Sequence, residues 1–161
     1  MSELTLAERM TLMETTLERA AEAVGDLTRP VRDRFYRRYP EAAASFHELG
    51  LGEPGPLEAR MIESALFCLM HWLEESTVVK TLVDVYLPHH CITLNVREEW
   101  FQGMVEETAD IVMETIPPEQ AAEQAVWGEI RAGLIAAIAD AASAPDMVRL
   151  NALGESARLP A

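Results

Sequence analysis

The sequence predicts an all-α fold in a single domain. Apolar residues recur at three- and four-residue steps along several segments, no useful stretch alternates as a β-strand does, and Gly and Pro separate the periodic segments. At 161 residues and 49% hydrophobic, the chain has enough apolar material for one sizeable core. We therefore expect about six to eight helices within residues 1–145, followed by a partly disordered tail of residues 146–161.

The first two predicted helices lie in the N-terminal part of the chain. Apolar residues keep helical spacing from Leu6 to Val24, and Gly25 is suited to end that helix. Thr28 and Pro30 then follow in the order of a helix cap and a first-turn proline. A second helix should begin there and stop near Pro40.

The middle of the chain predicts two helices separated by a short break. The Gly/Pro-rich passage 50–56 holds no regular element. From Leu57 to Leu73 an apolar stripe has helical spacing, and Glu58, Glu63 and Glu74 are available to water. Residues 74–76 then separate this helix from the segment 78–101.

His90 is the residue around which the chemistry of this segment is organised. It follows Val79, Val83 and Tyr86 at helical steps, so one helix face should carry its imidazole inward. Pro88 should break or kink the helix just before it. A buried neutral imidazole needs a backbone carbonyl, a carboxylate or a metal as partner, and its two nitrogens can serve two such roles. A hydrogen-bonded core histidine and a metal ligand both remain open.

The C-terminal part predicts two further helices. One follows Asn95 and is stopped by Pro117 and Pro118. The other carries a single apolar stripe made of Trp127, Ile130, Leu134 and Ile138.

Three passages in this order resemble bacterial single-domain globins and the globin domain of flavohaemoglobins. They are Pro40 with Phe46, the run His90, Cys91, Asn95, Val96, Trp100 and Phe101, and Trp127 with Gly128. The gap from His90 to Val96 is one residue longer than in that family, and Asn95 stands in place of a glycine. Asn tolerates the left-handed backbone conformation that glycine supplies there.

The resemblance implies a globin-like fold with haem b as cofactor and His90 as the protein ligand of its iron. The haem pocket would be built from six apolar side chains: Phe46, Ile62, Leu66, Val96, Phe101 and Leu134. The same side chains would equally well pack against one another as an ordinary core. Arg32 and Glu58 fall at the distal positions where such globins place Tyr and Gln. As an alternative, Arg32 and Glu58 form an ordinary ion pair or both face water, since burying either unpaired is costly.

The function that this resemblance implies is reversible binding of a diatomic gas, oxygen or nitric oxide, for carriage, storage or sensing. Flavohaemoglobins support the ligand histidine with Tyr and Glu, where this chain has Phe101 and Ala142. We therefore predict no turnover, and no phosphate loop, nucleophile elbow or HExxH motif suggests another chemistry. The alternative is a haem-free globin-fold domain for sensing or protein interaction.

Charge and cysteine usage limit the partners and the compartment. A formal charge of -14 argues against binding to nucleic acid or an anionic membrane. Cys68 and Cys91 lie in apolar segments without paired spacing, and neither a signal-peptide pattern nor a membrane-spanning run is evident. We expect a cytoplasmic protein, and a homodimer or a separate protein partner remains open.

Overall fold

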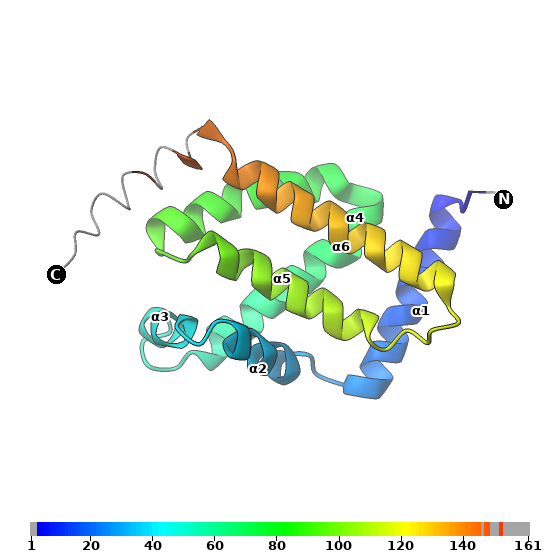
Figure 1. Cartoon of the computed structure of the whole chain (residues 1–161), viewed down its shortest axis with the longest axis horizontal. Coiled ribbons are helices and arrows are strands. Elements are labelled where there is room, and N and C mark those ends of the chain that lie inside the picture. Colours follow the sequence, from blue (N-terminus) through cyan, green and yellow to red (C-terminus); the bar gives the residue numbers. More distant parts are fainter. Residues whose placement is uncertain (1–2, 146, 149–151, 153–161) are drawn as a thin grey trace.

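The structure, a computed structural model, describes residues 3–145, 147, 148 and 152, and the regular elements among them are all helical. The prediction of an all-α fold of about six to eight helices is confirmed. Figure 1 shows the arrangement. The elements in chain order are α1 (Leu6–Val24), α2 (Thr28–Arg38), α3 (Ala42–Leu49), α4 (Gly55–Pro88), the π-helix η1 (His89–Thr93), α5 (Glu98–Met113) and α6 (Ala121–Ala142).

The limits of α1 agree with the prediction at both ends. A capping box fixes its start: the Thr5 hydroxyl accepts the Glu8 N–H at 3.3 Å, and the Glu8 carboxylate accepts the Thr5 N–H at 2.8 Å. Gly25 follows the helix with a φ of 73°, a conformation that glycine adopts without a steric penalty. The helix therefore ends where its sequence signals place it.

The start of α2 differs from the prediction in its cap. Thr28 is the first helical residue, and the Asp26 carboxylate accepts its N–H at 2.7 Å. Asp accepts such a bond readily because its short side chain reaches the first free N–H groups of a helix. The hydrogen bond of the Asp26 carboxylate lowers its pKa. The N-cap residue is Leu27, and Asp26, which precedes it, supplies the side-chain acceptor that was predicted at Thr28.

A kink divides α4 into a first limb, residues 55–74, and a second limb, residues 76–88. Glu75 has φ -127° and ψ 37°, outside the helical region, within the break predicted at residues 74–76. Along the second limb Val79 and Val83 are buried as predicted, whereas Tyr86 is 43% exposed and Leu87 is fully buried instead. The inward face of this limb is therefore rotated toward Leu87.

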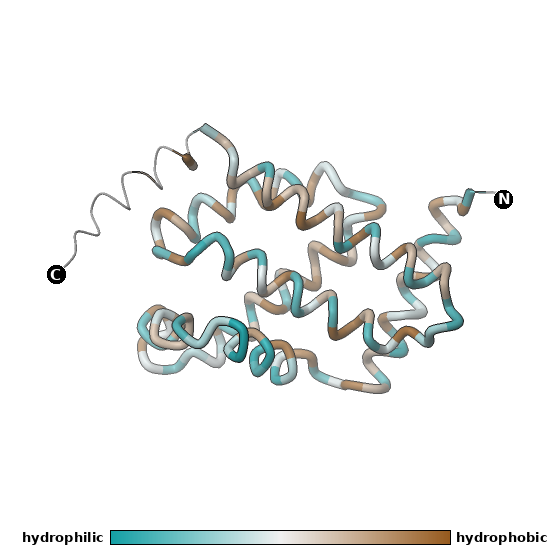
Figure 2. Tube along the Cα trace, viewed as in Figure 1, coloured by the Kyte–Doolittle hydropathy of each residue, from teal (hydrophilic) through white to brown (hydrophobic). Residues whose placement is uncertain are grey.

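The buried side chains form two core clusters. The larger joins α1, both limbs of α4, α5 and α6, with Trp127 and Leu134 from α6 at its centre. The smaller joins α2, α3, the first limb of α4 and α5, around Phe35 and Phe46. Hydrophobic and hydrophilic positions are interspersed along each helix in Figure 2, as expected for helices that bury one face.

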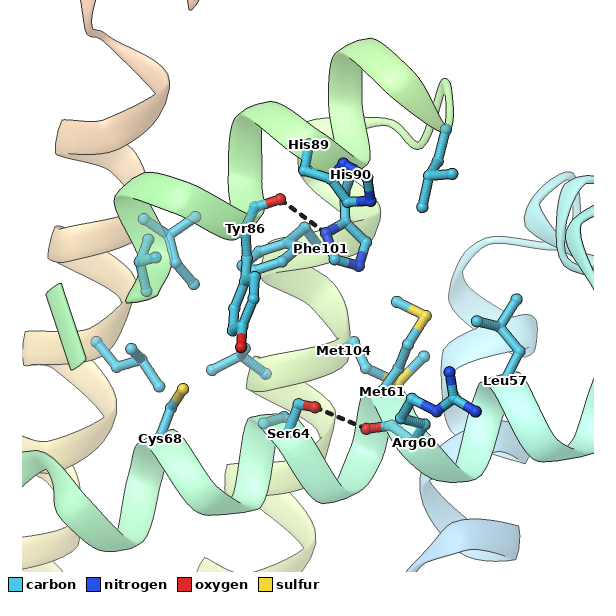
Figure 3. Close-up of a pocket in the computed structure, with 16 residues that line it drawn as sticks. Leu57, Arg60, Met61, Ser64, Cys68, Tyr86, His89, His90, Phe101 and Met104 are labelled. Atoms are coloured by element: carbon cyan, nitrogen blue, oxygen red, sulfur yellow. Dashed lines mark hydrogen bonds between the residues drawn. The ribbon is translucent and has the colours of Figure 1, made fainter. Parts of the chain in front are cut away.

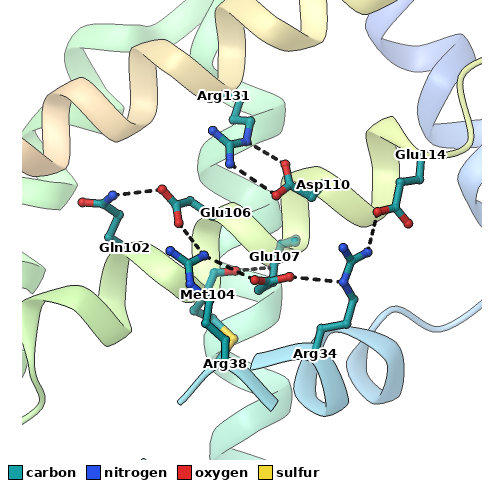
Figure 4. A network of polar contacts seen from close by, with 10 residues as sticks. Arg34, Arg38, Gln102, Met104, Glu106, Glu107, Asp110, Glu114 and Arg131 are labelled. Carbon is teal, nitrogen blue, oxygen red and sulfur yellow. Dashed lines mark hydrogen bonds and ion pairs between the residues drawn. The ribbon is translucent and has the colours of Figure 1, made fainter. Parts of the chain in front are cut away.

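Carboxylates on α5 are buried against arginines of α2. Glu106 and Glu107 are each 8% exposed. The Arg38 guanidinium lies 2.7 Å from Glu106 and 3.3 Å from Glu107, and Arg34 lies 3.2 Å from Glu107 and 2.7 Å from Glu114 (Figure 4). Buried carboxylates need such partners, because an unpaired one is costly to desolvate. These ion pairs hold α2 against α5 in a chain rich in negative charge.

Two glycines of α6 have opposite surroundings. A Cβ added at Gly133 would lie 2.5 Å from the Trp72 ring, whereas one added at Gly128 meets nothing within 4 Å. We predict that Gly133→Ala lowers the free energy of unfolding by about 1–3 kcal/mol through overpacking. Gly128→Ala, the matched control, should raise it by about 0.5–1 kcal/mol through helix propensity. Urea denaturation measures both, and equal effects would contradict a close α4–α6 contact at Gly133.

Packing continues past residue 145. Met147 is 1% exposed and belongs to the larger core cluster. The remainder of the predicted tail, residues 146, 149–151 and 153–161, lies outside the described residues. Among the residues described, no helix is both long and apolar enough to cross a bilayer.

Candidate functional site

A cavity of about 340 Å³ lies where the two core clusters meet. The two limbs of α4 face each other across it, and α5 and α6 close its remaining walls (Figure 3). Its volume falls in the range of small-molecule sites, roughly 300–1,000 Å³. Sixteen residues line it: Leu57, Arg60, Met61, Ser64, Ala65, Cys68, Val83, Tyr86, His89, His90, Leu94, Phe101, Met104, Val105, Leu134 and Ile138.

His90 presents one ring nitrogen to this cavity. Its Nδ1 lies 2.7 Å from the backbone oxygen of Tyr86, and because a carbonyl only accepts, Nδ1 carries the hydrogen. Nε2 of the neutral ring then keeps a free lone pair, and it points across the cavity toward Met61 and Arg60 in Figure 3. The Phe101 ring packs edge-on against the imidazole, with the ring centroids 5.5 Å apart. Orientation by a hydrogen bond at the other nitrogen is typical of metal-ligating histidines.

The backbone around His90 explains how the ring is aimed. The α-helix ends at Pro88, and the chain continues as the π-helix η1, in which the Leu94 N–H donates to the His89 carbonyl at 3.3 Å. Asn95 then has φ 53°, and the Val96 N–H donates to the His90 carbonyl at 2.9 Å. The left-handed conformation expected for Asn95 is confirmed. Short π-helices are often found at functional sites.

The wall opposite His90 comes from the first limb of α4. Arg60 and Ser64 are exposed, so the cavity reaches the surface beside them. The Ser64 hydroxyl donates to the Arg60 carbonyl at 2.8 Å, which directs it back to its own helix. No ion pair of Arg60 occurs within the described part of the chain, which leaves its guanidinium available to an anionic group of a ligand. The wall itself follows helical spacing: Leu57, Arg60, Met61, Ser64, Ala65 and Cys68.

Both cysteines are free thiols, and one of them lines the cavity. Burial raises the pKa of the Cys68 thiol. Burial, with a smaller contribution from Glu98, raises the pKa of Cys91 to about 11. Since the thiolate is the nucleophile and the metal-binding form, neither cysteine is activated at neutral pH.

Three of the residues predicted for the pocket meet at the cavity, and four do not. His90, Phe101 and Leu134 line it. Phe46, Ile62 and Val96 are buried in the smaller core cluster, and Leu66 is half-buried outside the lining. Phe46 packs on the rings of Phe35 and Tyr36, with centroids 5.6 and 5.9 Å away. Of these predicted pocket residues, the observed cavity therefore shares His90, Phe101 and Leu134.

Arg32 and Glu58, which were predicted for the distal side, do not line the cavity. Arg32 pairs with Asp33 at 2.8 Å, and Glu58, 4% exposed, accepts the Tyr36 hydroxyl at 2.6 Å. Neither alternative for Glu58 is observed: within the described residues no ion pair joins it to Arg32, and its side chain is buried rather than exposed to water. Burial, together with the hydrogen bond to Glu58, raises the pKa of Tyr36. Tyr36 provides the partner that a buried carboxylate needs.

Sequence reasoning missed Arg60, Met61, Cys68 and Met104 as cavity residues. From the apolar stripe between Leu57 and Leu73 the prediction chose Ile62 and Leu66 as pocket residues, whereas Arg60, Met61 and Ser64 line the cavity. The available signal was the position of Leu57, three and four residues before Arg60 and Met61.

Comparison with known proteins gives no match: no family model, no curated protein and no solved structure is similar to this chain. Within residues 3–145, 147, 148 and 152, no group of three or more His, Cys, Asp or Glu side chains is arranged to hold a metal ion.

Proposed function

We propose that this chain is a haem-binding protein of the globin type that reversibly binds a diatomic gas for carriage, storage or sensing. The observation that carries the proposal is His90, whose Nδ1 donates to the Tyr86 carbonyl and whose Nε2 faces an apolar cavity. His89 also lines the cavity, but its side chain is exposed, and of the two rings only that of His90 is held by a hydrogen bond within the described residues. One oriented imidazole suits a metal that arrives with its other ligands already in place, as haem iron does. When bound, haem supplies the iron to which oxygen or nitric oxide coordinates.

The other cavity residues fit a flat apolar macrocycle. Phe101, Val105 and Leu134 offer apolar surface on the α5 and α6 walls. Haem carries two carboxylates on one edge, and Arg60 stands where the cavity reaches the surface. A guanidinium there can pair with a carboxylate while both remain partly hydrated. The apolar walls of the cavity thus match the apolar macrocycle of haem, and the exposed Arg60 guanidinium matches its carboxylates.

The surroundings of His90 favour binding over turnover. Its partner is the neutral carbonyl of Tyr86, and its neighbour on α5 is the apolar ring of Phe101. A carboxylate at either place would make the ring a stronger electron donor to a metal. The chain's own contribution is therefore to orient the imidazole.

Titration of the purified chain with haemin, followed by its Soret absorbance, tests this proposal. We expect a sharp end point at one haem per chain and a higher melting temperature, since a ligand at about 100 times its dissociation constant adds about 2.7 kcal/mol to the free energy of unfolding. A colourless protein after reconstitution would reject the proposal.

A second candidate is a haem-free domain that binds an apolar acid. Two observations favour it: the cavity volume lies near the lower end of the range for ligand sites, and Arg60 is available to a single carboxylate. The haemin titration repeated in the presence of a long-chain fatty acid separates the two functions. Displacement of the acid by haemin supports the globin function, and retention of the acid without a Soret band supports the second candidate.

A further inference from the structure

Besides His90 and the adjacent, exposed His89, the cavity lining holds a group that can coordinate a metal on the opposite wall. Met61 is half-buried on the first limb of α4 and extends from it toward His90 in Figure 3. A thioether is a soft ligand that coordinates iron without losing a proton, and a histidine–methionine pair is an established axial set for haem. The Met61 sulfur is therefore a ligand candidate in a place where the sequence alone suggests only core packing.

The other side chains of this wall are less suited to the role. Leu57 and Ala65 have no donor atom, and the Ser64 hydroxyl is committed to the Arg60 carbonyl. Arg60 is a cation, and it cannot donate an electron pair to a metal. Cys68 would have to ionise, which its burial opposes.

Met104 also lines the cavity, but its setting differs. It projects from α5, is 3% exposed, and belongs to the smaller core cluster with Phe35 and Trp100. A side chain packed in this way has little freedom to reach a metal. Met61 is only packed against that cluster from its edge, which leaves its flexible thioether free to adjust.

We propose that Met61 Sδ is the second protein ligand of the metal that His90 holds, an inference that rests on the proposed haem function. The two ligands come from the two limbs of α4, so the bound group is clamped between them. A diatomic gas then binds only in molecules from which Met61 has moved away. Its apparent affinity falls by the fraction of such molecules, roughly tenfold if one molecule in ten is open.

Spectroscopy of the haem-loaded wild-type chain tests this without any substitution. We expect a low-spin, six-coordinate spectrum in both oxidation states, and in the ferric form the weak near-infrared band that arises from charge transfer between a thioether and iron. A five-coordinate, high-spin spectrum in the loaded wild type would overturn the inference and leave the haem function standing. Absence of any Soret band would overturn both.

Met61→Leu and its matched control Met104→Leu assign the ligand. Both changes conserve side-chain volume and should preserve the fold, which far-ultraviolet circular dichroism verifies. We expect Met61→Leu to lose the near-infrared band, become high-spin and bind carbon monoxide roughly tenfold more tightly, while Met104→Leu resembles the wild type. Loss of the band in Met104→Leu alone, or an unchanged Met61→Leu, would overturn the assignment.

Discussion

Replacing His90 by alanine is expected to weaken haem binding by about a hundredfold or more, since even loss of a group that only orients a metal ligand costs roughly 10–100-fold. The imidazole is the cavity's oriented nitrogen donor, held by the 2.7 Å hydrogen bond from its Nδ1 to the Tyr86 carbonyl. The variant should show a displaced and diminished Soret band in the haemin titration. Its fold should persist, because the ring is only partly buried.

His71 supplies a matched control for this experiment. It makes the same type of contact, with Nδ1 2.9 Å from the Phe67 carbonyl, but it lies outside the cavity lining. His71→Ala should therefore leave the titration unchanged. In a His90→Gly variant, added free imidazole should restore the Soret band by occupying the vacated space. Equal loss in the His90 and His71 variants would contradict a ligand role for His90.

Replacing Arg19 by methionine is expected to lower the free energy of unfolding clearly more than removal of an exposed arginine does, because it leaves the buried Glu123 carboxylate without its charged partner. Glu123 on α6 is 3% exposed, and two guanidinium nitrogens of Arg19 on α1 contact its carboxylate at 2.5 and 2.9 Å. The Thr16 hydroxyl donates to the same carboxylate at 2.7 Å. Urea denaturation at neutral pH measures the effect.

Arg29→Met is the control for removal of an arginine. Its pair with Asp33 spans 3.8 Å, and its side chain is 85% exposed. Pairs of this kind contribute only about 0–1 kcal/mol. A loss as large in Arg29→Met as in Arg19→Met would show that burial of Glu123 is not the cause.

The Arg19 effect should depend on pH. The Arg19 hydrogen bonds, and to a smaller extent that of Thr16, lower the pKa of Glu123. A carboxylate with a lowered pKa stabilises the fold above its unfolded pKa, about 4.3 for glutamate, and that contribution is lost as the pH falls through the folded value. In Arg19→Met the arginine hydrogen bonds, which are the main cause of the lowered Glu123 pKa, are absent. The difference in the free energy of unfolding between the wild type and Arg19→Met should therefore become smaller below about pH 4. A difference that stays constant with pH would contradict a stabilising role of the Arg19–Glu123 pair.

The helices were predictable because their signals are local. Each signal acts within a few residues of the helix end or break that it determines. The capping box of Thr5 with Glu8 starts α1, Gly25 follows its end, and the kink in α4 lies at Glu75. The cap of α2 was misassigned because Asp26 and Thr28 are both good caps and sequence spacing does not decide between them.

The site was less predictable because burial and access to a cavity are different properties. Ile62 and Leu66 have the apolar character of pocket residues, but Ile62 is buried in the smaller core cluster and Leu66 is half-buried outside the cavity lining. Arg60 and Ser64 line the cavity although they are polar. Phe46 could pack on a cofactor or on Phe35, and only the three-dimensional arrangement of α2 and α3 selects the second. Periodicity identifies which residues share a helix face, but it does not show what that face meets.

The widened coil of η1 has a consequence for the length of the chain between His90 and Val96. A π-helix takes up more residues in each turn than an α-helix, so it can house a residue gained by insertion without passing the displacement on to the next element. The interval from His90 to Val96 therefore has room at η1 for one residue to be inserted or removed beside the imidazole.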